Sequence, residues 1–148
     1  MRSRAQGRIR TAPVDPRPVG STTERERAPV LQWTFAALNT IELPIQQLAE
    51  IDLFHADERW ANERRPAAVE RVRTRLGELA AALDGHDHLV GSFSAADVLM
   101  TSVLGILRHT NLLAEHPALG AYQARCEARP AFQRALEGQM AAFGPPAT

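Results

Sequence analysis

The sequence predicts an all-α protein, a helical bundle of about five helices. Apolar residues recur at three- and four-residue steps along most of the chain, and residues that favour helix starts precede several of these stretches. No segment shows the polar–apolar alternation or the Val, Ile and Thr density that is typical of a strand. The 148 residues are enough for one domain with a core and too few for two ordinary ones.

The composition excludes several classes of function but does not identify one. The 17 basic and 17 acidic side chains cancel and 45% of the residues are apolar, so we expect a folded protein that does not bind nucleic acid. All basic residues are arginine, which excludes lysine chemistry. The single cysteine, Cys126, forbids an intramolecular disulfide and fits a reducing compartment, and no apolar run is long enough to cross a membrane. We therefore expect a cytoplasmic protein without a membrane partner.

Residues 1–22 are expected to form a disordered tail. This segment has three prolines and few large apolar residues. It can bury too little apolar surface to offset the conformational entropy that it would lose on folding. A solvated tail is the favoured interpretation of its arginines, and a basic docking arm is the alternative. The helical domain is expected over residues 23–144, and residues 145–148 form a second short tail.

The first helix is expected to run from about residue 24 to residue 54. Thr23 and Glu26 match a capping box, and apolar residues then recur at helical spacing. Pro44 lacks an amide hydrogen and crowds the carbonyl four residues earlier, so a kink is expected near residues 40–43.

The second helix is expected to follow a polar stretch at residues 55–65. Pro66 is suited to a first helical position, and an amphipathic pattern follows it. The Asp84-Gly85 pair predicts the end of this helix, because glycine adopts the left-handed conformation that terminates helices.

The most informative local pattern is Phe93-Ser94-Ala95-Ala96-Asp97-Val98. Ser94 and Asp97 match a capping box and Phe93 can pack onto Val98, so a helix is predicted to begin at Ser94. This helix is apolar nearly all round, which indicates a central position. Asp97 resembles a catalytic carboxylate in isolation, but capping is the favoured role, and its truncation is expected to cost about 0.5 to 2 kcal/mol.

Two further helices are predicted to begin at Pro117 and Pro130, each ahead of apolar residues at helical spacing. Cys126 lies on the same helical face as Leu119 and Tyr122, so a small buried hydrophobe is favoured over a redox thiol.

A metal pair is one interpretation of His86 and His88. Both lie in one loop with no third ligand nearby in sequence, so solvated turn residues are the favoured interpretation and no metal site is predicted.

Taken together, these helices resemble the C-terminal, all-helical domain of cytosolic glutathione transferases. The resemblance covers about residues 24–143. It is carried by Arg27-Ala28, Leu31-Gln32-Trp33, Ala37-Leu38-Asn39, Phe93-Ser94-Ala95-Ala96-Asp97, Pro117-Ala118-Leu119-Gly120-Ala121-Tyr122 and Arg129-Pro130-Ala131-Phe132.

The resemblance implies a second, thioredoxin-like half that holds glutathione and stabilises its thiolate. No strand pattern, cis-proline setting or γ-glutamyl-binding pair precedes residue 24. We therefore expect a truncated family member with no catalytic residue and no cofactor bound by this chain alone, glutathione being the co-substrate in the family. Without the activated thiolate, we expect negligible conjugating activity.

The helical half of such enzymes contributes a pocket for the electrophile and part of the dimer surface. The resemblance places that pocket along the first helix, at Trp33, Phe35, Leu38, Asn39 and Glu42. Packing in the core or in a dimer is the simpler interpretation of these residues. A homodimer or another protein partner is expected to bind through the first two helices. Two alternatives stay open: a protein–protein interaction module of the same fold, and a fragment of a complete, active transferase.

Overall fold

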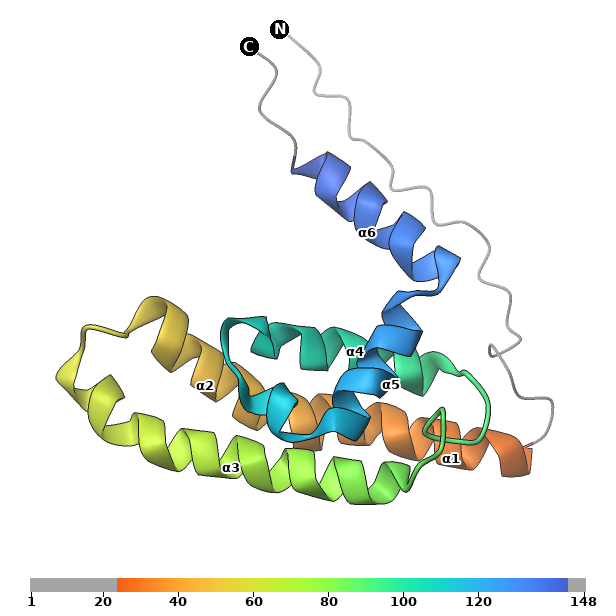
Figure 1. The fold of residues 1–148 in the computed structure, drawn as a ribbon, viewed down its shortest axis with the longest axis horizontal. Helices are drawn as coiled ribbons and strands as arrows, with labels where there is room; N and C mark the ends of the chain where they lie inside the picture. The colour runs from red at the N-terminus through yellow and green to blue at the C-terminus, as the bar shows by residue number, and fades with distance from the viewer. Residues whose placement is uncertain (1–23, 144–148) are drawn as a thin grey trace, which may run out of the picture.

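The computed structural model describes residues 24–143, which form helices joined by short loops (Figure 1). The helices are α1 (Glu24–Phe35), η1 (Ala36–Ile41), α2 (Glu42–Phe54), α3 (Arg59–Leu83), α4 (Ala95–Gly105), η2 (Ile106–His109), η3 (Leu112–Glu115), α5 (Pro117–Glu127) and α6 (Pro130–Ala142). Within these residues there is no strand, which confirms the all-α class, and no helix is long and apolar enough to span a membrane. The predicted tails and the capping residue Thr23 lie outside the described residues.

The first predicted helix is one continuous rod made of α1, η1 and α2. Its predicted irregularity is a π-helical segment, η1, in which the Glu42 amide donates to the Ala37 carbonyl five residues earlier. The segment begins ahead of the predicted kink at residues 40–43 and overlaps its first two residues. Since Pro44 offers no amide to the Thr40 carbonyl, the wider turn rearranges the backbone hydrogen bonds just ahead of the proline.

The prediction that the second helix begins at Pro66 is wrong, because α3 begins at Arg59 and contains Pro66. The Asn62 amide and its side-chain Nδ2 both donate to the Glu58 carbonyl, at 3.1 and 3.2 Å. Arg65 donates two hydrogen bonds to the Asp52 carboxylate on α2, at 2.7 and 3.0 Å. These contacts stabilise the turns before the proline, where local sequence signals are weak.

The predicted end of this helix is confirmed. Asp84 caps α3 in the left-handed conformation with φ 41°, and Gly85 follows with φ 74°. Both residues of the pair therefore take positive φ, and glycine bears that conformation without steric cost.

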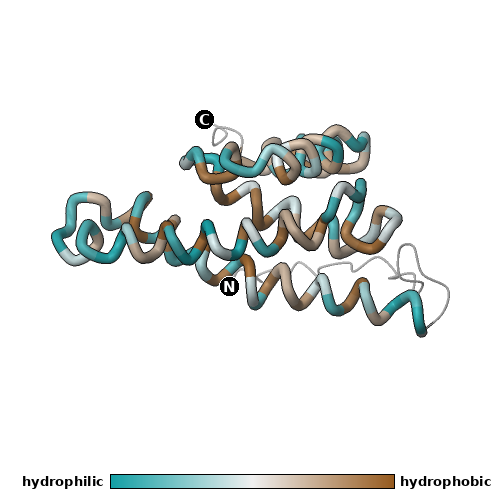
Figure 2. Tube along the Cα trace, turned by 60° about the horizontal axis from the view of Figure 1, so that its bottom comes forward, coloured by the Kyte–Doolittle hydropathy of each residue, from teal (hydrophilic) through white to brown (hydrophobic). Residues whose placement is uncertain are grey.

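The core lies between η1, α2, α3, α4 and α5, and α4 packs against α1, η1, α2 and α5. Hydrophobic and hydrophilic segments alternate along the helices, as expected for rods with one buried face (Figure 2). The predicted central position of α4 holds for most of its surface, but Val98 is 46% exposed and Ser102 is also exposed. The largest side chains that are fully buried are Tyr122, Ile45, Leu48, Leu76, Leu79, Met100, Leu104, Leu107 and Leu119.

The last two helices begin at Pro117 and Pro130, as predicted. The helix α6 projects from the bundle and meets it through α5 (Figure 1). None of its residues is buried, and Met140 is 62% exposed. The apolar side of α6 is therefore largely uncovered.

We predict opposite effects on the free energy of unfolding for two glycine-to-alanine substitutions. In both, the added Cβ atom has no neighbouring atom within 4 Å. Gly85→Ala places a side chain at positive φ and is expected to lower the free energy of unfolding by about 1 kcal/mol. Gly120→Ala lies within α5 and is expected to raise it by about 0.5–1 kcal/mol. Urea denaturation measures both, and a shift of the same sign would contradict the assigned backbone conformations.

Candidate functional site

The Asp97 carboxylate is fully buried and accepts hydrogen bonds from four donors. Oδ2 accepts the Ser94 backbone amide at 2.8 Å and the Ser94 hydroxyl at 3.0 Å. Oδ1 accepts the Leu89 amide at 3.1 Å and the Tyr122 hydroxyl at 3.0 Å. Asp97 and Ser94 form a capping box, and the same carboxylate ties the preceding loop and α5 to the start of α4.

These contacts make Asp97 a structural group rather than an acid or base open to substrate. Burial and the Asp97 charge both raise the pKa of Tyr122, so its hydroxyl stays protonated and donates to the carboxylate. Phe93, just before the cap, packs against the core, and the Arg129 guanidinium lies 3.6 Å from the centre of its ring.

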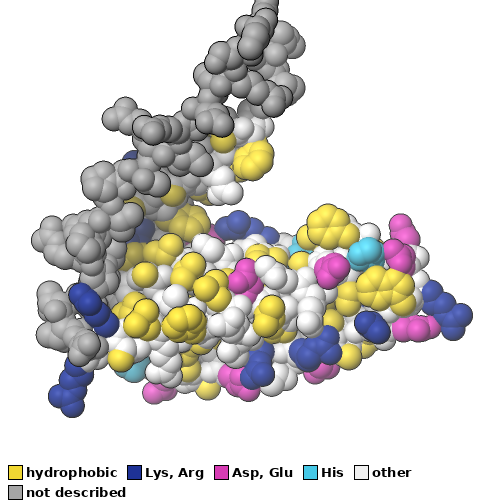
Figure 3. All heavy atoms as spheres, turned by 180° about the vertical axis from the view of Figure 1, so that it is seen from behind, with side chains coloured by type: hydrophobic (Ala, Val, Ile, Leu, Met, Phe, Trp, Pro, Cys, Tyr) yellow, Lys and Arg dark blue, Asp and Glu magenta, His cyan; other side chains and the backbone are white. Residues whose placement is uncertain are grey.

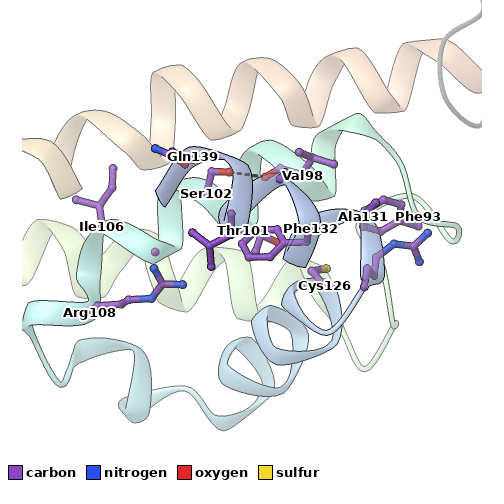
Figure 4. Close-up of a pocket in the computed structure, with 14 residues that line it drawn as sticks. Phe93, Val98, Thr101, Ser102, Ile106, Arg108, Cys126, Ala131, Phe132 and Gln139 are labelled. Atoms are coloured by element: carbon purple, nitrogen blue, oxygen red, sulfur yellow. Dashed lines mark hydrogen bonds between the residues drawn. The ribbon is translucent and has the colours of Figure 1, made fainter. Parts of the chain in front are cut away.

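A cavity of about 690 Å³ lies between α4 and α6 (Figure 4). This volume lies within the range of small-molecule sites. Most of its wall is apolar, and Arg108 in the wall pairs with Glu127 at 2.7 Å. The lining residues are Phe93, Val98, Thr101, Ser102, Gly105, Ile106, Arg108, Cys126, Arg129, Ala131, Phe132, Ala135, Leu136 and Gln139.

None of the five residues predicted for the substrate pocket lines this cavity. Trp33 is partly buried against the core, whereas Phe35 is 60% and Leu38 is 38% exposed. Asn39 borders a separate hollow of about 540 Å³ between η1, α2 and α3. Glu42 is half-buried and accepts a hydrogen bond from Gln46 at 2.8 Å.

The sequence did not predict the cavity beside α6. The apolar spacing after Pro130 predicts a helix and gives no sign of a cavity beside it. A signal that was available is Ser102, an exposed polar residue of α4 that lines the cavity.

A row of large apolar side chains is exposed along the first rod. Figure 3 shows hydrophobic side chains spread over the face of the molecule that Figure 1 hides. The members of the row are Leu31, Phe35, Leu38, Leu43, Leu53 and Phe54, each between 38% and 78% exposed. We call these six residues the exposed row.

The histidines and the cysteine differ in burial. His86 is exposed, as predicted for a turn residue, whereas the side chain of His88 is only 20% exposed and its Nδ1 lies 3.9 Å from Asp97 Oδ1. The expectation that His88 is solvated is therefore wrong, because the loop turns its ring toward Asp97. Cys126 is 2% exposed and burial raises its pKa, which agrees with the predicted buried thiol.

Comparison with known proteins gives a consistent match. The family model described as "Glutathione S-transferase, C-terminal domain" matches residues 46–130. A glutathione transferase from Pseudomonas putida is 21% identical with a TM-score of 0.71, over 78% of this chain and 53% of that one. Glutathione transferase F7 from Populus trichocarpa is 24% identical with a TM-score of 0.66, over 78% and 57%.

A glutathione S-transferase from Xylella fastidiosa is 23% identical with a TM-score of 0.67, over 78% of this chain and 57% of that one. The chain thus spans a little over half the length of these solved structures. None of the curated proteins compared with the chain matches it significantly.

We predict that Asp97→Ala lowers the free energy of unfolding by about 3–5 kcal/mol, because three buried donor groups lose their acceptor together. This exceeds the loss expected for a single capping bond. The matched control is Asp87→Ala, which removes an exposed carboxylate 3.3 Å from Arg125 and is expected to cost less than about 1 kcal/mol. Urea denaturation of both variants gives the comparison, and equal losses would refute the role assigned to Asp97.

Proposed function

Because the chain belongs to the glutathione S-transferase C-terminal domain family, we propose that it serves as the helical half of a glutathione-conjugating enzyme. In this proposal the rod of α1, η1 and α2 lines the pocket for the electrophilic substrate and contributes to a dimer surface. The observation that carries the proposal is the exposed row. Six large apolar side chains are exposed along this one rod, and a covering molecule or domain accounts for them.

The proposed substrate pocket consists of Trp33, Phe35, Leu38, Asn39 and Glu42. Phe35 and Leu38 offer exposed apolar surface for an electrophile, and Asn39 and Glu42 add polar groups beside it. Leu38 and Asn39 lie in the π-helical segment η1, and π-helical turns are frequent at functional sites. The exposed positions and the irregular backbone therefore support the same part of the rod.

Glutathione is the proposed co-substrate of the complete enzyme. The Pseudomonas putida transferase binds one glutathione disulfide per subunit, and a transferase from Burkholderia graminis binds two glutathione molecules per subunit. Both are relatives in fold, which supports glutathione as the thiol that the proposed enzyme uses. The proposed location is the cytoplasm, where the buried thiol Cys126 stays reduced.

We further propose that the 148-residue chain has no conjugating activity by itself. Conjugation needs a hydroxyl or thiol donor that stabilises the glutathione thiolate. The sequence has one tyrosine and one cysteine, and both are buried. The Tyr122 hydroxyl is bound to Asp97, and burial raises the pKa of the Cys126 thiol. The Ser102 hydroxyl beside the cavity donates to the Val98 carbonyl, so none of the three is available for this task.

A protein–protein interaction module is the second candidate function. It is favoured by α6, which has an apolar side but no buried residue among those described. An amphipathic helix in this state offers a surface for a partner protein. Co-purification of one defined partner that depends on α6 would favour this candidate over an enzyme subunit.

We predict no turnover above the uncatalysed rate when the purified chain is assayed with glutathione and a chloronitrobenzene electrophile. Without thiolate stabilisation, apolar binding of the electrophile does not accelerate the chemical step. The assay follows product absorbance against an enzyme-free blank. Robust turnover that scales with protein concentration would contradict the proposed inactivity of the chain.

We also predict that the chain self-associates through the exposed row. Sedimentation velocity is expected to show a dimer that Phe35→Glu weakens by at least about tenfold, since a charge is introduced into an apolar contact. Gln32→Glu is the control, because it adds the same charge at an exposed neighbouring position. A monomer at all concentrations, or equal effects of both variants, would count against a dimer surface on this rod.

A further inference from the structure

Three side chains of metal-binding type converge behind the N-terminus of α4. They are His88 in the loop before α4, Asp97 in its first turn and Cys126 near the end of α5. One ligand atom from each lies within 4.8 Å of the other two. The sequence separates these residues widely, so no short motif reveals the cluster.

Two buried polar atoms at this cluster have no hydrogen-bond partner. His88 Nδ1 faces Asp97 Oδ1 at 3.9 Å, which is too long for a hydrogen bond. Thr101 Oγ1 is also unpartnered in a side chain that is 1% exposed. Buried polar atoms without partners are uncommon in folded proteins and call for an explanation such as an ion.

The Asp97 carboxylate has the surroundings of a metal ligand. Carboxylates that bind metals are themselves held by hydrogen bonds from outer residues. Here the Ser94 amide and hydroxyl hold Oδ2, while the Leu89 amide and the Tyr122 hydroxyl donate to Oδ1, the oxygen nearer His88. The Asp97 carboxylate is therefore already held in a fixed orientation. A metal ion at Oδ1 replaces one of the two donors to that oxygen.

We propose that His88, Asp97 and Cys126 bind a zinc ion. Zinc accepts nitrogen, oxygen and thiolate sulfur together, in a tetrahedral arrangement with bonds of about 2.0–2.3 Å. Such bonds place the ligand atoms about 3.3–3.7 Å apart, so the site closes by about 1 Å. His88 lies in the loop between α3 and α4, between Gly85 and Gly91, which are both at positive φ, so in this proposal the closure falls on the loop rather than on a helix.

Zinc binding at this site releases one proton. The Cys126 S–H bond breaks, its proton goes to solvent, and a sulfur–zinc bond forms with no change in oxidation state, while His88 binds as the neutral ring. Cys126 lines the cavity between α4 and α6, which gives the ion a route from solvent (Figure 4). The fourth position is left to water or to the Thr101 hydroxyl. The bound ion joins the loop, α4 and α5 as a structural site.

Cobalt titration of the metal-stripped full chain tests this proposal, because Co²⁺ bound to a thiolate in tetrahedral geometry has a charge-transfer band and intense visible bands. The expected result is one ion per chain with both spectral features. His88→Ala and Cys126→Ala are each expected to weaken binding by at least about 100-fold. His86→Ala is the matched control in the same loop and is expected to leave the affinity unchanged.

Thermal unfolding with zinc gives a second readout. A zinc concentration about a hundredfold above Kd is expected to raise the Tm of the chain by on the order of 5–10 °C, and to leave that of His88→Ala unchanged. Absence of the thiolate band in the unmodified chain overturns the proposal and leaves the cluster as a helix cap. Binding that survives both ligand variants, or that fails in His86→Ala, also overturns it. Circular dichroism checks that each variant is folded. If Cys126→Ala does not fold, the thiolate band of the unmodified chain and the comparison of His88→Ala with His86→Ala still decide the test.

Discussion

The buried Asp97 carboxylate is the interaction on which the rest of the fold depends. Burying a carboxylate away from water has a large desolvation cost unless hydrogen-bond donors surround the carboxylate. Here the four donors come from three places: two from Ser94 at the start of α4, one from Leu89 in the preceding loop, and one from Tyr122 on α5. Because α4 also packs against α1, η1 and α2, the carboxylate fixes the helix around which the others are arranged. One buried charge therefore couples a local helix start to the tertiary arrangement of the bundle.

The first rod has a side that is buried in the core and also apolar residues that are exposed. Ala37, Ile41 and Ile45 are buried against the core, while Leu38 and Leu43 are exposed among them. A π-helical turn holds more residues than an α-helical turn, so it shifts the register between the segments before and after it. The segment proposed to meet a substrate is thus the segment where the backbone departs from regular geometry.

The features that the sequence predicted correctly depend on a few neighbouring residues. The features that it missed depend on contacts between helices that are distant in sequence. The starts at Pro117 and Pro130 and the capping box at Asp97 follow from a few neighbouring residues, and the structure contains all of them. The start of α3 was predicted too late, because the pair between Arg65 and Asp52 joins two helices and has no sequence signature. The burial of His88 and the cavity beside α6 likewise arise only once distant helices pack together. The predicted substrate pocket was drawn from family resemblance rather than from local physics, and its five residues do not share one of the described cavities.

The helix α6 has little packing against the rest of the described bundle. It has 13 residues and no buried side chain. Isolated helices shorter than about 12–15 residues are marginal in water, since nucleation is costly and few hydrogen bonds follow it. Pro130 at its first position helps the helix begin, but Gly138 in its interior opposes it by about 1 kcal/mol. Packing of its apolar side is the remaining source of stability, and within the described residues that side meets only the open cavity next to α4. In the proposal that a partner binds α6, covering this side would stabilise the helix as well as the cavity wall, so binding and the ordering of the helix would be coupled.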